Sequence, residues 1–228
     1  ENTESDHAVE DGSRVRLWRH DLVKRSALFA SSIIASTVVG IFSIPILVSQ
    51  VGAATWGTLA VLQIVGQFFA VGTAFGWGAT GPSMVSGAPT EVRKSIFMDS
   101  LIVRGCLFLV LAPAAAFFGA VLTGVGPDVA VLAALTYVAP GLSAAWYFIG
   151  SNRPAALFLL DALPAILGQV TGLIAVLLSP DLRSYLTATA ICAIIGLVSS
   201  WVFVLSRHRD GPRRLPQRIP WGRLVHSQ

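Results

Sequence analysis

Between Arg25 and Glu91 the chain runs for 65 residues without one aspartate, glutamate, lysine or arginine. Four further uncharged runs follow at 105–127, 129–152, 162–180 and 184–206. An α-helix needs about 20 apolar residues to cross the hydrocarbon core of a bilayer, so the first run allows two crossings and each later run one. A transmembrane β-barrel is excluded, because its strands alternate whereas these runs are apolar on every face. The sequence therefore predicts an all-α, polytopic membrane protein with six transmembrane helices.

The six predicted helices form one bundle, residues 23–206, between two polar tails. The tail 1–22 leads with acidic residues, and the tail 207–228 carries six arginines. The segment 77–95 is predicted to be the longest connection within the bundle. The predicted spans are residues 26–48, 56–76, 96–120, 129–150, 155–178 and 184–206.

Lysine and arginine are distributed unevenly along this pattern. Fourteen of these 16 residues fall in four segments: the N-terminal flank, the segment 77–95, the turn at Arg153 and the C-terminal tail. If the six helices alternate in direction, these four segments lie on the same side of the membrane. Arg183 alone falls on the opposite side. Because cytoplasmic loops carry the excess of positive charge, we expect both termini in the cytoplasm of a cell membrane. The basic tail 207–228 then faces anionic membrane lipids, so no nucleic-acid partner is expected.

The sequence offers little for catalysis. Both cysteines fall inside apolar runs and all four histidines lie in the polar tails, so neither a disulfide framework nor a metal site is predicted. No nucleotide-binding motif and no catalytic triad spacing is found. We therefore expect no enzymatic activity, no cofactor and no metal.

Three ionisable residues fall inside predicted spans, where each costs about 2.5–3.5 kcal/mol at the helix centre. Arg104 and Asp161 lie at similar depths, roughly 12 Å and 9 Å from the starts of their spans, whereas Asp99 is about 140° around the helix from Arg104. Two interpretations are open. Arg104 and Asp161 form a salt bridge that pins two helices together, or Arg104 faces a cavity and receives an anionic group while Asp161 tunes it or exchanges a proton.

Uncharged polar residues and prolines also fall within the spans. Gln63 and Gln67 are one turn apart on one helix face, and Gln169 lies on the fifth span. Hydrogen bonding between helices is the first expectation for these amides, and lining a sugar-accommodating cavity is the second. Prolines break helical hydrogen bonding, and in a membrane such breaks persist where protein or a cavity satisfies the freed carbonyls. The prolines inside spans are Pro45, Pro113, Pro140 and Pro164.

Two short motifs resemble those of the O-antigen and polysaccharide flippases. The stretch GAATWG at 52–57 is similar to the Gly-x-x-x-(Tyr/Trp)-Gly turn of that family. The stretch WYFIG at 146–150, followed by Arg153, resembles its aromatic-Phe-Gln-Gly motif, with Ile149 in place of the glutamine and Asn152 where an acidic residue is frequent. The resemblance covers residues 20–206.

The resemblance implies a fold shared with multidrug and toxic-compound extruders (MATE-like) and the lipid II flippase. That fold has two six-helix bundles around a central cavity, so this chain would supply the N-terminal bundle and a second bundle would be its partner, in the same gene or another chain. The tail 207–228 would begin the linker.

The activity implied is the flipping of a polyprenyl-pyrophosphate-linked oligosaccharide by alternating access. Arg104, and then Arg153, would hold the pyrophosphate, while Gln63 and Gln67 would hold the sugar. A drug or cation extruder with Asp161 as its coupling carboxylate is one alternative. A non-transporting membrane subunit that organises polysaccharide synthesis enzymes is another.

Overall fold

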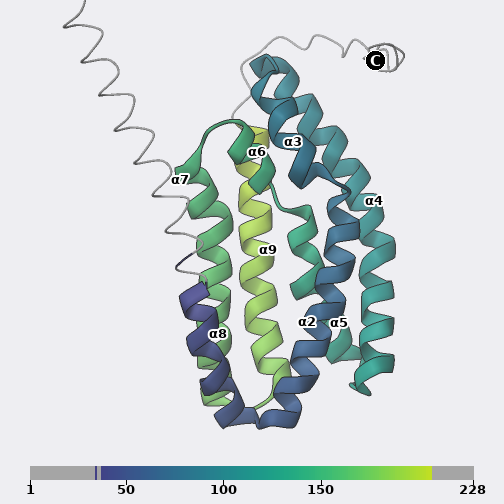
Figure 1. The fold of residues 1–228 in the computed structure, drawn as a ribbon, viewed down its shortest axis with the longest axis vertical. Coiled ribbons are helices and arrows are strands. Elements are labelled where there is room, and N and C mark those ends of the chain that lie inside the picture. Colours follow the sequence, from purple (N-terminus) through teal and green to yellow (C-terminus); the bar gives the residue numbers. More distant parts are fainter. Residues whose placement is uncertain (1–33, 35–36, 207–228) are drawn as a thin grey trace, which may run out of the picture.

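The computed structural model describes Ile34 and residues 37–206, and in these residues every regular element is helical (Figure 1). Five helical segments are long and apolar enough to cross a membrane, and a sixth apolar helix, Thr37–Val51, is shorter within the described residues. The all-α prediction is confirmed, and the five segments have the pattern of a multi-pass membrane protein. The predicted tails and residues 26–33, 35 and 36 of the first predicted span lie outside the described residues.

The helices run alternately between the two ends of the bundle (Figure 1). One end carries the connections at Gly52, 124–126 and 179–181, and the other carries those at 87–89 and 151–153. After the helix Thr37–Val51 come α2 (Ala53–Ala74), α3 (Trp77–Ser86), α4 (Thr90–Thr123), α5 (Pro127–Val138), the 3₁₀ turn η1 (Ala139–Leu142), α6 (Ala145–Gly150), α7 (Pro154–Leu157), the π turn η2 (Phe158–Ala162), α8 (Leu163–Leu178) and α9 (Leu182–Ser206).

The segment 77–95, predicted to be a connection between helices, is itself mostly helical, so this prediction is wrong. Phe75 and Gly76 adopt left-handed backbone angles, with φ of 46° and 73°, and end α2. The chain then continues as α3, which packs against α6. A side chain at Gly81 would overlap the Trp146 ring, and a Cβ at Gly150 would lie 2.6 Å from the carbonyl oxygen of Pro82. The small residues of α3 pack closely against α6, and this packing explains why the Gly- and Ser-rich segment is helical rather than a loop.

The fourth predicted span is interrupted. Helix α5 passes into η1 at Ala139, and Ser143 and Ala144 leave the helical path before α6 begins. Pro140 lies in this interruption, and Pro164 follows the π turn in the next span, as expected for residues without a backbone N–H. Pro113, by contrast, lies inside the continuous helix α4.

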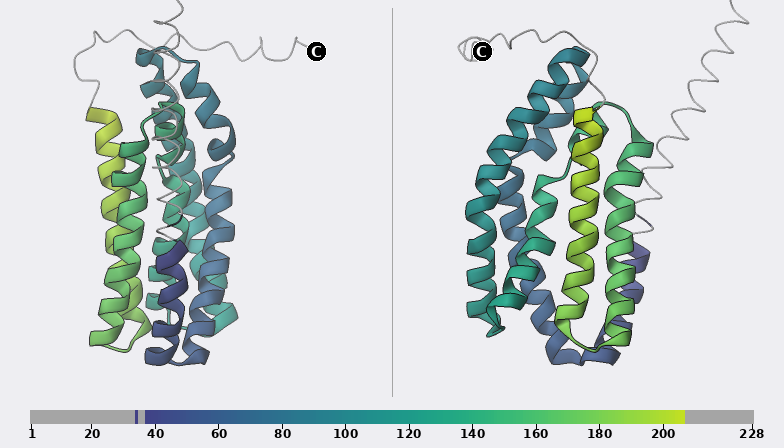
Figure 2. Two further views of the ribbon diagram at one scale, coloured as in Figure 1. Left: turned by 60° about the vertical axis from the view of Figure 1, so that its left-hand side comes forward. Right: turned by 180° about the vertical axis from the view of Figure 1, so that it is seen from behind.

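The described helices form two packed groups that face one another. In one group α2, α4 and α5 are in contact, and in the other α8 and α9 pack along their length (Figure 2). Glycines allow the close approach of α8 and α9: a Cβ at Gly172 would lie 2.9 Å from both Tyr185 and Thr189, and one at Gly196 would lie 2.6 Å from Pro164. Contacts between α5 and α9 join the two groups.

Candidate functional site

The interruption between α5 and α6 leaves backbone carbonyls without helical partners, and side chains from two other helices satisfy them. Trp201 on α9 donates its indole N–H to the carbonyl oxygen of Leu142, at 3.2 Å. Arg104 on α4 donates from Nη1 to the carbonyl oxygens of Gly141, at 3.2 Å, and Ser143, at 2.8 Å. An unsatisfied backbone group in the bilayer core costs several kcal/mol, so these side chains make the broken helix tolerable.

Arg104 is enclosed by this arrangement, with only 1% of its surface exposed. Its remaining bonds stay on α4, from Nε to the Ser100 carbonyl at 3.4 Å and from Nη2 to Ser100 Oγ at 3.2 Å. The guanidinium carbon lies 5.6 Å from the centre of the Trp146 ring, within the range of a cation–π contact. Four of its five N–H groups are therefore committed to the protein. Asp99 is exposed on α4, which confirms that the two residues occupy different helix faces.

Asp161 lies in the π turn η2 and is half-buried. Its carboxylate accepts a hydrogen bond from the hydroxyl of Ser143, and that hydroxyl oxygen also accepts one from the backbone N–H of Ala145 at 3.0 Å. Ser143 thus binds Arg104 through its carbonyl and Asp161 through its hydroxyl. We call Arg104, Ser143 and Asp161 the serine bridge.

A direct salt bridge between Arg104 and Asp161 is not formed among the described residues, and this interpretation is corrected. The prediction of similar depth is consistent with the structure, since both residues reach Ser143. The partner differs because the helix break exposes carbonyl oxygens that take up the guanidinium. The described part of the chain does form one ion pair, Arg183 to Asp128 at 2.9 Å, at an exposed position at the opposite end.

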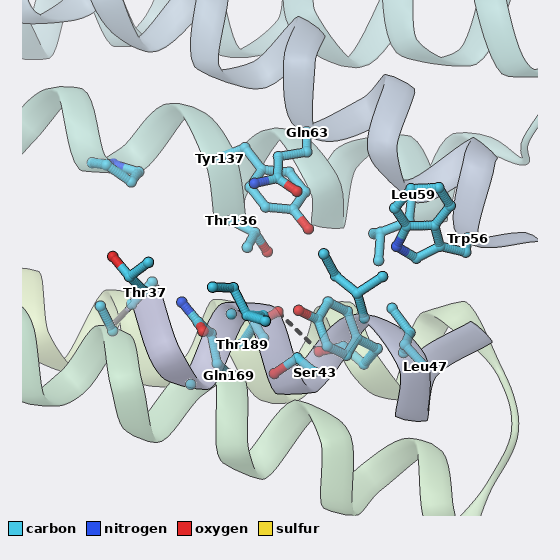
Figure 3. Close-up of a pocket in the computed structure, with 18 of the residues that line it drawn as sticks. Thr37, Ser43, Leu47, Trp56, Leu59, Gln63, Thr136, Tyr137, Gln169 and Thr189 are labelled. Atoms are coloured by element: carbon cyan, nitrogen blue, oxygen red, sulfur yellow. Dashed lines mark hydrogen bonds between the residues drawn. The ribbon is translucent and has the colours of Figure 1, made fainter. Parts of the chain in front are cut away.

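A cavity of about 440 Å³ lies between the two helix groups, and we call it the central cavity (Figure 3). Figure 3 shows Gln63, Thr136 and Tyr137 on one side of it, opposite Ser43, Gln169 and Thr189. No charged residue is among the described residues that line it. Its aromatic residues are Trp56, Tyr137 and Tyr185.

The polar groups of the central cavity differ in how far they are already bonded. The hydroxyls of Ser43, Thr136 and Thr189 donate to backbone carbonyls. The amide of Gln63 has no hydrogen bond within residues 37–206, and the buried Oε1 of Gln169 is without a partner there. The two amides therefore offer free donors and acceptors to a bound molecule, because each amide carries two N–H donors and a carbonyl acceptor.

A second cavity of about 350 Å³ adjoins the central one, and we call it the side cavity. Both are lined by Pro140, Pro164, Ala165 and Ala193, so they share a wall or an opening. Ser143 and Asp161 line only the side cavity. The serine bridge thus presents Asp161 to the side cavity and encloses Arg104.

The five predicted site residues do not lie at one site in the structure. Gln63 lines the central cavity and Asp161 the side cavity, whereas Arg104 lines neither. Gln67 is exposed one turn along α2 and lines neither cavity, and Arg153 lies in the turn before α7, beside a different pocket. Ser143 was not predicted, although the Pro140–Gly141 pair inside an apolar run is the kind of dipeptide that marks a turn.

No family model, curated protein or solved structure matches the chain. The resemblance to polysaccharide flippases therefore depends on the motifs at 52–57 and 146–150 and on the pattern of helices. What the protein does must be inferred from the cavities and the serine bridge.

Proposed function

We propose that the chain is one bundle of a membrane transporter that holds a neutral, hydroxyl-rich group in its central cavity. The observation that carries the proposal is the lining: free amides at Gln63 and Gln169, hydroxyls and three aromatic rings, without a charged side chain among the described residues. Amides exchange hydrogen bonds with sugar hydroxyls, and aromatic rings pack against the C–H faces of a sugar ring. A cavity of about 440 Å³ falls within the ordinary range of ligand sites.

The specific substrate we propose is a polyprenyl-pyrophosphate-linked oligosaccharide, moved from the cytoplasmic to the outer leaflet by alternating access. A second six-helix bundle would supply the facing wall of the cavity, as the resemblance to the flippases implies. Arg104 takes a new role in this proposal. Because its guanidinium is committed to Gly141, Ser143 and Ser100, it holds the broken helix and does not contact the pyrophosphate in this conformation.

A second candidate is a cation or drug extruder coupled to Asp161. It is favoured by one observation, that this carboxylate lines the side cavity and is bonded to a single side chain, the Ser143 hydroxyl. An intramembrane carboxylate beside a cavity is a common place for proton or cation exchange.

The test is flipping in proteoliposomes that contain a fluorescent polyprenyl-pyrophosphate-linked oligosaccharide, read as accessibility to a membrane-impermeant quencher. Gln63→Leu and Gln169→Leu should each slow flipping about fivefold, since a hydrogen bond contributes about 1 kcal/mol. Gln67→Leu is the matched control, because it changes the same residue type on the same helix outside the cavities, and it should flip at the wild-type rate.

Flipping rates of Gln63→Leu and Gln169→Leu that equal the rate of the Gln67→Leu control would contradict a sugar site in the central cavity. Extrusion of a cationic dye that needs Asp161, and that survives both glutamine substitutions, would instead establish the second candidate. Protein reconstituted together with its second six-helix bundle that moves neither probe would contradict transport by the protein.

A further inference from the structure

A third pocket, of about 400 Å³, lies at the end of the bundle where α6 turns into α7, and we call it the end pocket. It is formed by residues of the α6–α7 turn, α7, η2 and α9. Arg153 is the single charged residue among its described lining residues, and the others are apolar. Leu159 is 55% exposed on the side of the bundle, so the pocket continues onto an apolar helix surface. Its apolar lining includes Ala155, Ala156, Leu159, Leu160 and Phe203.

The backbone fixes the position of Arg153. The N–H of Arg153 bonds the Phe148 carbonyl at 2.9 Å, and the N–H of Asn152 bonds the Ile149 carbonyl at 3.0 Å. Asn152 has a left-handed φ of 54°, so this is a Schellman turn that closes α6. The backbone of Arg153 is therefore held in a defined position beside the apolar part of the pocket.

The Arg153 side chain also differs from those of the other described cations in having no partner within residues 37–206. Within residues 37–206, Arg93 donates to the Ala88 carbonyl, Lys94 to the Leu205 carbonyl, and Arg104 and Arg183 are bonded as described above. The half-buried guanidinium of Arg153 has no hydrogen bond or ion pair with any residue in that range. An unpaired cation beside an apolar groove is electrostatically suited to a ligand that carries both an anion and a hydrocarbon chain.

Charge complementarity favours a membrane lipid as this ligand. The same end of the bundle carries Arg93 and Lys94, and Lys94 reaches the end of α9 two residues beyond Phe203. Basic pockets between helices at the positively charged side of a membrane protein bind anionic headgroups. We propose that the end pocket binds an anionic glycerophospholipid of the adjacent leaflet, with its phosphate on Arg153 and an acyl chain along Leu159, Leu160 and Phe203. This inference does not depend on the proposed transport function.

The test uses the protein in phosphatidylcholine nanodiscs that contain phosphatidylglycerol with a photoactivatable diazirine in one acyl chain. After illumination, peptide mass spectrometry should locate adducts in residues 155–160 and around Phe203. Arg153→Gln should reduce these adducts about fivefold, because one arginine near an anionic membrane surface contributes about 1 kcal/mol. Arg153→Lys should retain most of the labelling, since it keeps the positive charge.

Two further variants separate the site from general charge effects. Arg183→Gln removes an arginine at the opposite end and should leave the adducts unchanged. Ala155→Trp, at an exposed position in the groove, keeps Arg153 and should remove the adducts by filling the pocket. Both variants are compared with the wild type for thermal unfolding before labelling, so a folding defect is recognised.

Several results would overturn the proposal. Equal labelling in Arg153→Gln, or equal labelling by a diazirine phosphatidylcholine, would show that the headgroup charge is not recognised. Displacement by inorganic phosphate would show that the hydrocarbon groove contributes nothing. Preferential displacement by polyprenyl phosphate at the same mole fraction would assign the end pocket to a polyprenyl substrate instead of a membrane phospholipid.

Discussion

Replacing Arg104 tests the central structural conclusion, that a buried cation stabilises a broken helix through backbone carbonyls. Arg104→Leu removes the donor from the carbonyl oxygens of Gly141 and Ser143. A buried acceptor left without a partner costs about 1–3 kcal/mol, so two such acceptors cost about 2–6 kcal/mol. Bonds between helices in membranes average about 0.6 kcal/mol, which sets a lower limit of about 1.2 kcal/mol for the pair.

The double substitution Arg104→Leu with Asp161→Leu distinguishes this explanation from a charge pair. If the two side chains stabilised each other directly, removing both would restore stability, because no buried charge would remain unpaired. The structure predicts no rescue, since both carbonyls still lack a donor and Ser143 loses its acceptor as well. Arg104→Lys should recover part of the loss, because an ammonium can reach a carbonyl but does not have the planar fork of a guanidinium.

The measurement is the free energy of unfolding in mixed detergent micelles, followed by tryptophan fluorescence and circular dichroism. Arg183→Leu is the control, since its ion pair with Asp128 is exposed and should contribute less than about 1 kcal/mol. Recovery of wild-type stability in the double variant would refute the reasoning. So would a loss below about 1 kcal/mol in Arg104→Leu alone.

Three further predictions follow from the helix connections and contacts. Gly81→Ala should destabilise the protein by about 1–3 kcal/mol through overlap with the indole on α6, whereas Gly78→Ala on the same helix, with nothing within 4 Å, should not; thermal unfolding compares the two. Asn152→Ala should lower the free energy of unfolding by about 1–2 kcal/mol, because alanine is strained at the left-handed φ of this position, whereas Asn152→Gly should be tolerated. Equal stability of the two variants in the same measurement would contradict this prediction. In a chain whose native cysteines are replaced, a cysteine at Ser179 should react with an impermeant thiol reagent added outside intact cells, and one at Ser86 only after lysis; the reverse pattern would invert the predicted orientation.

The order of the spanning helices could be predicted from the sequence because charge is costly inside a bilayer. The uncharged runs mark the helices directly, and Pro140 and Pro164 mark the two spans in which regular helix is interrupted. The face of Arg104 relative to Asp99 followed from helical geometry alone. These features depend on local sequence and on the solvent, so no knowledge of packing is needed.

The helical nature of α3 and the partners of Arg104 could not be predicted in the same way. Helix α3 is rich in glycine and serine, and it is stabilised by the aromatic surface of α6, more than 60 residues later in the chain. The acceptors of Arg104 are main-chain carbonyls, which every residue possesses. Only the location of the break makes the carbonyls of Gly141 and Ser143 available, whereas the sequence pattern indicates Asp161, the charged residue at a similar depth.

The serine bridge also has a consequence for the response of the protein to voltage. With Arg104 protonated and Asp161 ionised, the three-residue unit is electrically neutral, and its two charges are separated by one serine. When Asp161 takes up a proton, the unit keeps a net charge of one, that of the Arg104 guanidinium. A full elementary charge crossing the membrane field changes energy by about 2.3 kcal/mol per 100 mV, and a partial crossing by a proportionate share. If this part of the bundle moves across the membrane field during the proposed transport cycle, the protonation of Asp161 would set whether that motion is coupled to the membrane potential.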